Sequence, residues 1–158
     1  ASGDIGMGAA PYDGPMATYA GSLAATAGDG TGGGGTIYVT EVADGGDLNV
    51  TAVTSRRDGS TIQGASTASN TGTGIIEMQT SDGDLAVVNT GAAEDVSTQG
   101  GTSPTILLQA GYSDAIGGDN TVAINGGAAV QSENADIVAR ADNLTLSGQI
   151  TTDTGTSR

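Results

Sequence analysis

Short runs of β-branched residues recur along most of the chain at similar intervals. Each run places apolar side chains at alternate positions, which is the period of a β-strand. The first set of runs contains Ile37, Ile76, Ile106 and Ile137, which are 39, 30 and 31 residues apart. Asp-Gly and Gly-Gly turns separate the runs, and no stretch between them has the period of a helix. Such a repeat predicts strands that pair with their equivalents one repeat away.

Two further sets of runs complete each repeat. The second set comprises residues 47–50, 84–87, 120–124 and 143–146, and the third comprises residues 61–63, 96–99, 130–132 and 149–151. Three strands per repeat predict an all-β fold, namely a parallel β-helix or β-solenoid of about four three-stranded coils. An antiparallel sandwich of short hairpins is the alternative, and the similar spacing of the runs argues against it.

The composition agrees with a thin core. Only 27 of the 158 residues are Leu, Ile or Val, and the chain contains no Phe and no Trp. A compact globule of this length needs more bulky side chains to offset its conformational entropy. The core of a solenoid is a narrow column, so two inward side chains per strand are sufficient and outward positions can be Thr, Ser, Asn or Ala.

Residues 1–35 differ from the rest of the chain. They are rich in Gly and Ala and end in the Gly-rich stretch 28–35. We expect this part to be a linker or an exchange arm held by a neighbouring chain, with a disordered tail as the alternative. Residues 36–158 are expected to form the solenoid repeats.

Three runs, at residues 35–41, 105–111 and 141–148, resemble repeats of the filamentous haemagglutinin-like adhesins, which are giant secreted bacterial surface proteins. The resemblance covers residues 36–152. It implies a right-handed β-helical shaft outside a bacterium, within a protein longer than this chain, and adhesive contact with a host or neighbouring cell. The amino-terminal secretion module of that family is not visible here, so the export route stays open.

The missing residue types limit the chemistry. Without His and Cys the sequence offers no imidazole base, thiol nucleophile, zinc finger or disulfide. A net charge of -14, with four Arg as the only cations, disfavours nucleic acid and anionic membranes as partners. No apolar run is long enough for membrane insertion. Paired Asp residues suit glycoside hydrolysis, but the sequence has almost no aromatic platform for a sugar, and we expect no enzyme.

Acidic turns ahead of the second set of strands are the candidate metal site. The residues that would stack from coil to coil are Asp44, Asp47, Asp82, Asp84 and Asp119, with Asp114, Asp136 and Asp142 at related positions. Stacked carboxylates repel one another or recruit a cation, and calcium is the natural guest for oxygen ligands. Asp is also a favoured turn residue, so plain solvated turns are the alternative. No other cofactor is expected.

Two other polar features recur or stand out. The side-chain amides of Gln63, Gln99, Gln131 and Gln149 lie near the third set of strands and are expected to form a ladder along the axis. Arg56 and Arg57 interrupt an otherwise anionic surface. They are expected to be exposed turn residues, and pairing with Asp58, Glu41 or an acidic neighbouring subunit is the alternative.

The function expected from these features is mechanical. A solenoid presents unpaired backbone groups at its first and last coils, and these pair with further strands. We expect an extracellular shaft or fibre-forming segment at a cell surface, whose partners are further coils of a longer chain or copies of itself in a self-assembled filament. The alternative is an adhesive module that recognises a glycan or protein on one solenoid face, for which Tyr38 and Tyr112 are few.

Overall fold

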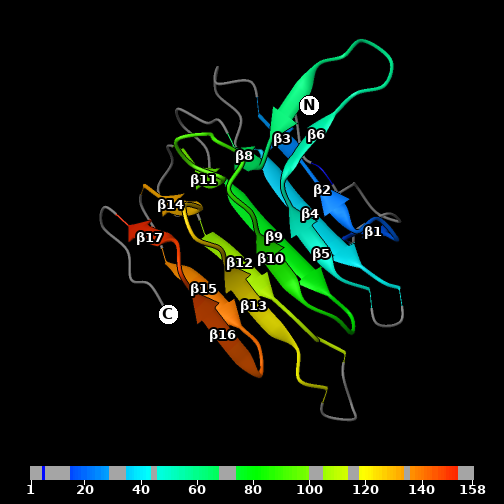
Figure 1. Cartoon of the computed structure of the whole chain (residues 1–158), viewed down its shortest axis with the longest axis vertical. Helices are drawn as coiled ribbons and strands as arrows, with labels where there is room; N and C mark the ends of the chain where they lie inside the picture. The colour runs from blue at the N-terminus through cyan, green and yellow to red at the C-terminus, as the bar shows by residue number, and fades with distance from the viewer. Residues whose placement is uncertain are drawn as a thin grey trace.

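The structure is a computed structural model that describes residues 5, 15–28, 35–43, 46–67, 74–99, 105–113, 118–133 and 136–152. These ranges contain 17 strands and no helix. Figure 1 shows three parallel sheets that share one axis and a hairpin that projects from them. The fold is therefore the predicted all-β parallel solenoid.

Each coil of the solenoid contributes one strand to each of three five-stranded sheets. Sheet 1 contains β1 (Met16–Thr18), β4 (Thr36–Glu41), β9 (Ile75–Thr80), β12 (Thr105–Gln109) and β15 (Ile137–Arg140). Sheet 2 contains β2 (Ser22–Leu23), β5 (Leu48–Val50), β10 (Leu85–Val87), β13 (Thr121–Ile124) and β16 (Asn143–Leu146). Sheet 3 contains β3 (Ala25–Ala27), β8 (Ala65–Thr67), β11 (Val96–Thr98), β14 (Ala129–Ser132) and β17 (Gln149–Thr152). Coils 1 to 5 are numbered in this order.

The number of coils differs from the expectation of about four. Residues 16–27, expected within the amino-terminal arm, form coil 1 and pair in parallel with β4, β5 and β8 of coil 2. Their strands are two or three residues long, are rich in Ala and contain no Ile or Val, so they lack the pattern of the other coils. The solenoid therefore begins before residue 36 and has five coils.

The core consists of columns of inward side chains in register. Ile37, Ile76 and Ile106 pair directly with one another across the strands of sheet 1 and are 0% exposed. Ile5 extends this column by a parallel bridge to Ile37, and Ile137 ends it in coil 5. Each buried Ile contributes about 1.5–3 kcal/mol of hydrophobic stabilisation. A chain with few bulky residues thus forms a continuous core by concentrating them in columns.

One predicted core strand has a different role. Residues 61–63 were expected to be the third strand of coil 2, but they form β7 (Thr61–Gln63), which pairs antiparallel with β6 (Ala52–Thr54) in a hairpin. The third strand of coil 2 is β8 instead. The Thr-Ile-Gln run has the stronger β-propensity, but its closest partner in sequence is β6 across a short turn. The prediction for these three residues was therefore wrong.

The expected ladder of Gln side chains is also absent from sheet 3. Gln131 pairs with Ser97 and Thr151, whereas Gln149 pairs with Ala129, so these two amides lie in different rows. The inward row of this sheet instead begins at Ala27 and continues with four small hydroxyl residues next to one another: Thr67, Thr98, Ser132 and Thr152. The Thr98 hydroxyl donates to that of Ser132 at 3.3 Å.

Replacing Thr67 with valine is expected to raise the free energy of unfolding by about 1 kcal/mol. The Thr67 side chain is buried and its Oγ1 has no hydrogen-bond partner, so valine keeps the shape and removes an unpaired polar atom. Thr98→Val is the matched control, because it removes the bond to Ser132 and is expected to lower stability. Denaturant unfolding followed by circular dichroism measures both, and a stability loss in Thr67→Val would contradict the prediction.

Candidate functional site

The surface formed by coil 5 is the most unusual part of the molecule. Leu144 and Leu146 pair in register with Val122 and Ile124, which are 0% and 1% exposed. Leu144 and Leu146 themselves are 49% and 56% exposed. In the described part of the chain no strand pairs with the outer edge of β15, β16 or β17. Two side chains at core positions are therefore left exposed to solvent at the end of the solenoid.

We define the C-terminal face by Ala139, Leu144, Leu146 and Ile150, which end four core columns. Ala139 and Ile150 are half-buried and pack against the core. The backbone of β16 runs along this face, and all four of its residues are exposed. The face combines apolar side chains with an unpaired strand edge, which is the arrangement that pairs with another strand.

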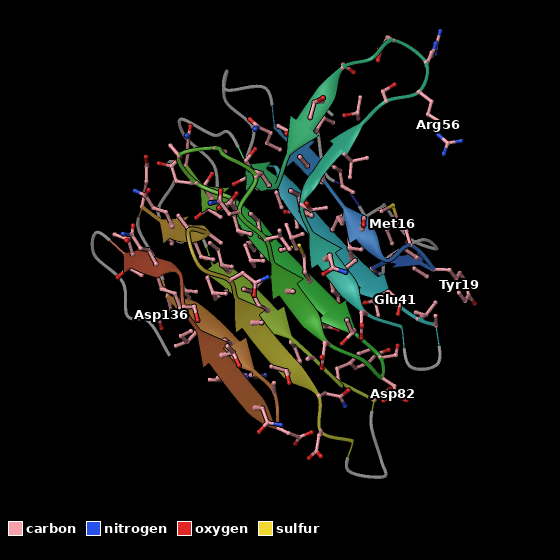
Figure 2. The ribbon with its side chains drawn as sticks, viewed as in Figure 1. Met16, Tyr19, Glu41, Arg56, Asp82 and Asp136 are labelled. Carbon is pink, nitrogen blue, oxygen red and sulfur yellow. The ribbon has the colours of Figure 1, made fainter. Side chains whose placement is uncertain are left out.

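The opposite surface, formed by coil 1, is built from smaller residues. We define the N-terminal face by Ile5, Met16, Gly21, Leu23 and Ala25. Met16 is 40% exposed, Leu23 is half-buried and Ala25 is buried. Met16 and Tyr19 mark this end of the molecule in Figure 2. The two faces of the solenoid therefore differ in the size and exposure of their side chains.

The acidic turns are brought together only in part. Asp47 and Asp84 precede β5 and β10, and the Asp84 backbone N–H donates to Asp47 Oδ1 at 2.9 Å. The Thr121 backbone N–H donates in the same way to Asp84 Oδ1 at 2.7 Å. The two carboxylates thus cap backbone groups of the following coil. Their spacing in the sequence already indicated that they would stack.

The other predicted metal ligands do not join this pair. Asp82 is half-buried in the turn after β9, Asp119 is exposed, and Asp44 lies outside the described residues. Among the residues that the structure describes, no three carboxylates are close enough together to hold a metal ion. Hydrogen bonds from backbone N–H groups account for the positions of Asp47 and Asp84 without a metal ion.

A carboxylate that the sequence indicated only as a partner for Arg56 and Arg57 lies buried at the end of β4. Glu41 is 1% exposed, and its Oε1 accepts a hydrogen bond from the Ala43 backbone N–H at 3.0 Å. Its Oε2 has no hydrogen-bond partner. The alternation that places Ile37 and Val39 inward also places Glu41 inward, so the signal was present in the sequence. Gly46 packs directly against this carboxylate and leaves no room for a larger residue.

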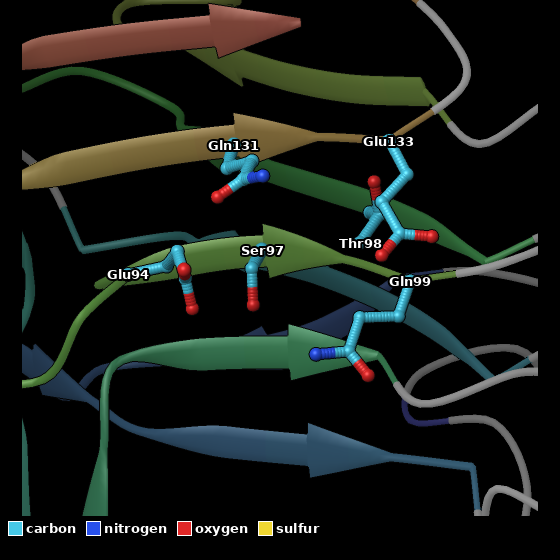
Figure 3. A pocket seen from close by; sticks show the side chains of 6 residues that line it. All are labelled: Glu94, Ser97, Thr98, Gln99, Gln131 and Glu133. Atoms are coloured by element: carbon cyan, nitrogen blue, oxygen red, sulfur yellow. The ribbon is translucent and has the colours of Figure 1, made fainter. Parts of the chain in front are cut away.

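A small polar hollow lies on the outer side of sheet 3 (Figure 3). Its lining residues are Glu94, Ser97, Thr98, Gln99, Gln131 and Glu133. The hollow has a volume of about 60 Å³, enough for a few water molecules. Substrate pockets usually measure about 300–1,000 Å³, and no basic residue lines this one. It is therefore a hydrated surface feature with no resemblance to an enclosed active site.

The outer side of sheet 1 carries the aromatic residue that the binding-module alternative relies on. Tyr38 pairs in register with Glu77, and Gln79 Nε2 donates to Glu77 Oε1 at 2.6 Å. Burial raises the pKa of the Glu77 carboxyl, and the Arg140 guanidinium partly opposes this rise. The pKa of Tyr38 is also raised, mainly by burial and then by the charges of Glu77 and Tyr112. This surface is partly desolvated but offers no enclosed site.

The hairpin of β6 and β7 projects from coil 2, with Arg56 at its tip (Figure 2). All of its strand residues are exposed, and Val53 pairs with Ile62. The tip is ordered by Asp58, whose Oδ1 accepts from the Ser60 backbone N–H at 3.0 Å and from the Ser60 hydroxyl at 2.7 Å. These bonds lower the pKa of Asp58 from 3.8 to about 2.

Replacing Ser60 with alanine is expected to raise the pKa of Asp58 from about 2 toward 3.8, because the Ser60 hydroxyl is the largest cause of the depression. A depressed carboxyl pKa stabilises the tip above pH 3.8, and that stabilisation is lost as pH falls toward 2. The carbon chemical shift of the Asp58 carboxyl, followed by NMR against pH, measures the midpoint. An unchanged midpoint in Ser60→Ala would contradict this assignment.

No protein-family model, no curated protein and no solved structure matches this chain. Within the described ranges, no helix has the length and apolar character needed to cross a membrane. The resemblance to the filamentous haemagglutinin-like adhesins stays a prediction from the sequence.

Proposed function

We propose that the protein is a structural β-solenoid segment, a shaft or fibre-forming unit at a bacterial cell surface that assembles through strand pairing at its open end. The observation that carries this proposal is the exposure of Leu144 and Leu146 at core positions of coil 5. The columns to which they belong are completely buried one coil earlier. One more parallel coil, supplied by the same polypeptide or by another one, would bury this face.

The shape of the molecule supports a mechanical role. The hydrogen bonds of the three sheets run along the axis and connect all five coils. A pull along the axis is therefore shared by three parallel sheets. The sequence contributes no His or Cys, and the one small hollow described above is open and polar. These observations support a scaffold over an enzyme.

A binding module is the second candidate. It is favoured by the outer side of sheet 1, where burial raises the pKa values of both Tyr38 and Glu77. An aromatic ring beside a carboxylate is suited to a hydroxyl-rich ligand such as a glycan. Tyr112 adds an exposed aromatic residue, 47% exposed, in the turn that follows β12. Both proposals place the protein outside the cell, in contact with a host or a neighbouring cell.

Sedimentation velocity and negative-stain microscopy test the structural proposal. At 0.5 M NaCl, which screens the net charge of -14, the wild-type chain is expected to form particles longer than one solenoid. Leu146→Lys is expected to stay monomeric, because its charge would be buried by any covering coil. Tyr112→Lys is the matched control, since Tyr112 is 47% exposed but does not belong to the C-terminal face. A wild-type chain that stays monomeric, or equal assembly of the two variants, would contradict the proposal.

The same measurement in calcium and in a chelator tests the acidic turns. Assembly that requires calcium would make Asp47 and Asp84 candidate ligands in addition to backbone caps. Equal assembly in both buffers would leave them with the capping role alone.

A further inference from the structure

We propose that the C-terminal face is covered by coil 1 of a second copy of this chain, which continues all three sheets in register. The inference rests on the proposed function and names its partner. Translation of a copy along the axis by five coils brings β1, β2 and β3 onto β15, β16 and β17. Every strand pair in this contact is then parallel, as in the four coil interfaces within the chain.

The register of the chain determines which residues meet. The column that starts at Met16 passes through Val39, Met78 and Leu108 and ends at Ala139. The column that starts at Leu23 passes through Val50, Val87 and Ile124 and ends at Leu146. A second copy in the same register places its Met16 on Ala139 and its Leu23 on Leu146. Both columns then continue without interruption.

The sizes of the facing side chains are complementary. Ala139 is the smallest member of its column, and Met16, which is 40% exposed, would cover it. In sheet 3 the order is reversed, since the column that begins at Ala25 ends at the bulkier Ile150. In these two columns a large residue thus meets a small one, which keeps the volume of a core layer nearly constant.

Leu144 also meets a small residue. Gly21 precedes β2, and its carbonyl oxygen accepts from the Asn49 backbone N–H at 3.0 Å, so it lies over Leu48 of the next coil. The column of Leu48 passes through Leu85 and Val122 and ends at Leu144. In the second copy Gly21 therefore lies over Leu144, where it leaves space for a side chain that is half exposed in the single chain.

The hairpin of β6 and β7 is compatible with this contact. It arises at the corner between sheets 2 and 3, and it packs beside β2 and β3, along the flank of coil 1. In Figure 1 it continues past the body of the solenoid on the side away from β16. The connection between sheets 2 and 3 becomes shorter along the chain: it is 88–95 in coil 3, 125–128 in coil 4 and 147–148 in coil 5. A copy stacked on coil 1 would therefore place its shortest connection, 147–148, next to the hairpin. The hairpin then lies beside the neighbour and leaves the N-terminal face open.

Charge opposes the contact and makes it dependent on salt. Each copy carries a net charge of -14, so two copies repel one another at low ionic strength. At 0.5 M NaCl the Debye length falls to about 4 Å, and the repulsion is largely screened while the apolar contact persists. Head-to-tail association is expected to strengthen as salt is added.

Two half-blocked variants test the arrangement at 0.5 M NaCl by sedimentation velocity. Leu146→Lys blocks the C-terminal face and Met16→Lys blocks the N-terminal face, both at exposed positions, so circular dichroism is expected to show an intact fold. Each variant alone is expected to be monomeric, with self-association weakened at least about 30-fold, as for the loss of one hot-spot side chain. An equimolar mixture is expected to form a 1:1 dimer and nothing larger, because one free face of each kind remains.

The outcomes separate this inference from the proposed function. If Met16→Lys alone dimerises, two C-terminal faces meet, and the head-to-tail contact is wrong while assembly through the open end stands. If Met16→Lys forms the same long particles as the wild type, the partner does not use coil 1 and the inference is also overturned. If the wild type itself stays monomeric in high salt, both the inference and self-assembly fail.

Discussion

Replacing Gly64 with alanine is expected to lower the free energy of unfolding by about 4 kcal/mol or more. Gly64 has a φ of +64°, and a Cβ at this position would overlap the backbone carbonyl oxygen of Asp95. The clash cannot be relieved by a rotamer change, because the obstructing atom belongs to the backbone of the next coil. That same oxygen accepts a hydrogen bond from the Ala65 N–H at 2.8 Å.

The position of Gly64 explains why so large an effect is expected. Its N–H donates to the Thr51 carbonyl at 3.1 Å, and its carbonyl accepts from the Ala25 N–H at 2.9 Å. Gly64 therefore connects the base of the hairpin to coil 1 on one side and touches coil 3 on the other. Any shift that makes room for a methyl group breaks backbone pairing in sheet 3.

Gly91→Ala is the matched control for this prediction. Gly91 has a similar φ of +81°, but a Cβ there would meet no atom within 4 Å. The expected loss is therefore only the cost of a left-handed conformation for alanine, about 1 kcal/mol. Denaturant unfolding of both variants measures the difference. Equal losses would show that conformation alone matters and that the contact with Asp95 does not.

The sequence predicted the coils whose strands are rich in β-branched residues and missed the coil that is not. Ile37, Ile76, Ile106 and Ile137 form one column, as their spacing indicated. Coil 1 escaped notice because alanine carries no strong β-propensity, and its strands exist through pairing with coil 2. Tertiary pairing also determined which segment became the third strand of coil 2. Residues 61–63 have the stronger β-propensity, but they pair with β6 in the hairpin, and β8 takes the place in sheet 3.

For the C-terminal face, the sequence predicted which side chains point inward but not that they are exposed. Alternation within residues 143–146 already placed Leu144 and Leu146 on the inward side. Their exposure depends on whether another strand covers coil 5, and the alternation of residues within 143–146 carries no information about that. The stacking of Asp47 and Asp84 was likewise predictable from their equivalent turns. The backbone N–H groups that donate to their carboxylates, those of Asp84 and Thr121, could be identified only from the structure.

Replacing Asp95 with alanine is expected to lower the free energy of unfolding by about 3–5 kcal/mol. Asp95 is 1% exposed, and its Oδ1 accepts from both the backbone N–H and the hydroxyl of Thr90, at 2.7 and 2.6 Å. Its Oδ2 accepts from the Ala129 N–H at 2.9 Å. The carboxylate thus joins the corner of coil 3 to the first residue of β14 in coil 4. Alanine leaves these three donors without their acceptor.

Asp95→Asn and Asp58→Ala separate the contributions. Asparagine keeps the shape and one acceptor oxygen but directs an NH₂ group at an N–H or hydroxyl donor, so an intermediate loss is expected. Asp58 accepts two bonds from Ser60 but is fully exposed, and water replaces those bonds when it is changed to alanine. A loss in Asp58→Ala as large as that in Asp95→Ala would contradict the argument from burial.

The loss in Asp95→Ala is expected to be uneven along the axis. Each coil touches only its neighbours, so stability in such a chain is close to a sum of coil and interface contributions. The bond between Asp95 and Ala129 belongs to the interface of coils 3 and 4, and weakening it favours opening of coils 4 and 5 ahead of coils 1 to 3. Hydrogen exchange should show faster exchange of the amides in β12 to β17 and little change in β4 and β5. A uniform increase across all five coils would indicate that the solenoid opens as a single cooperative unit.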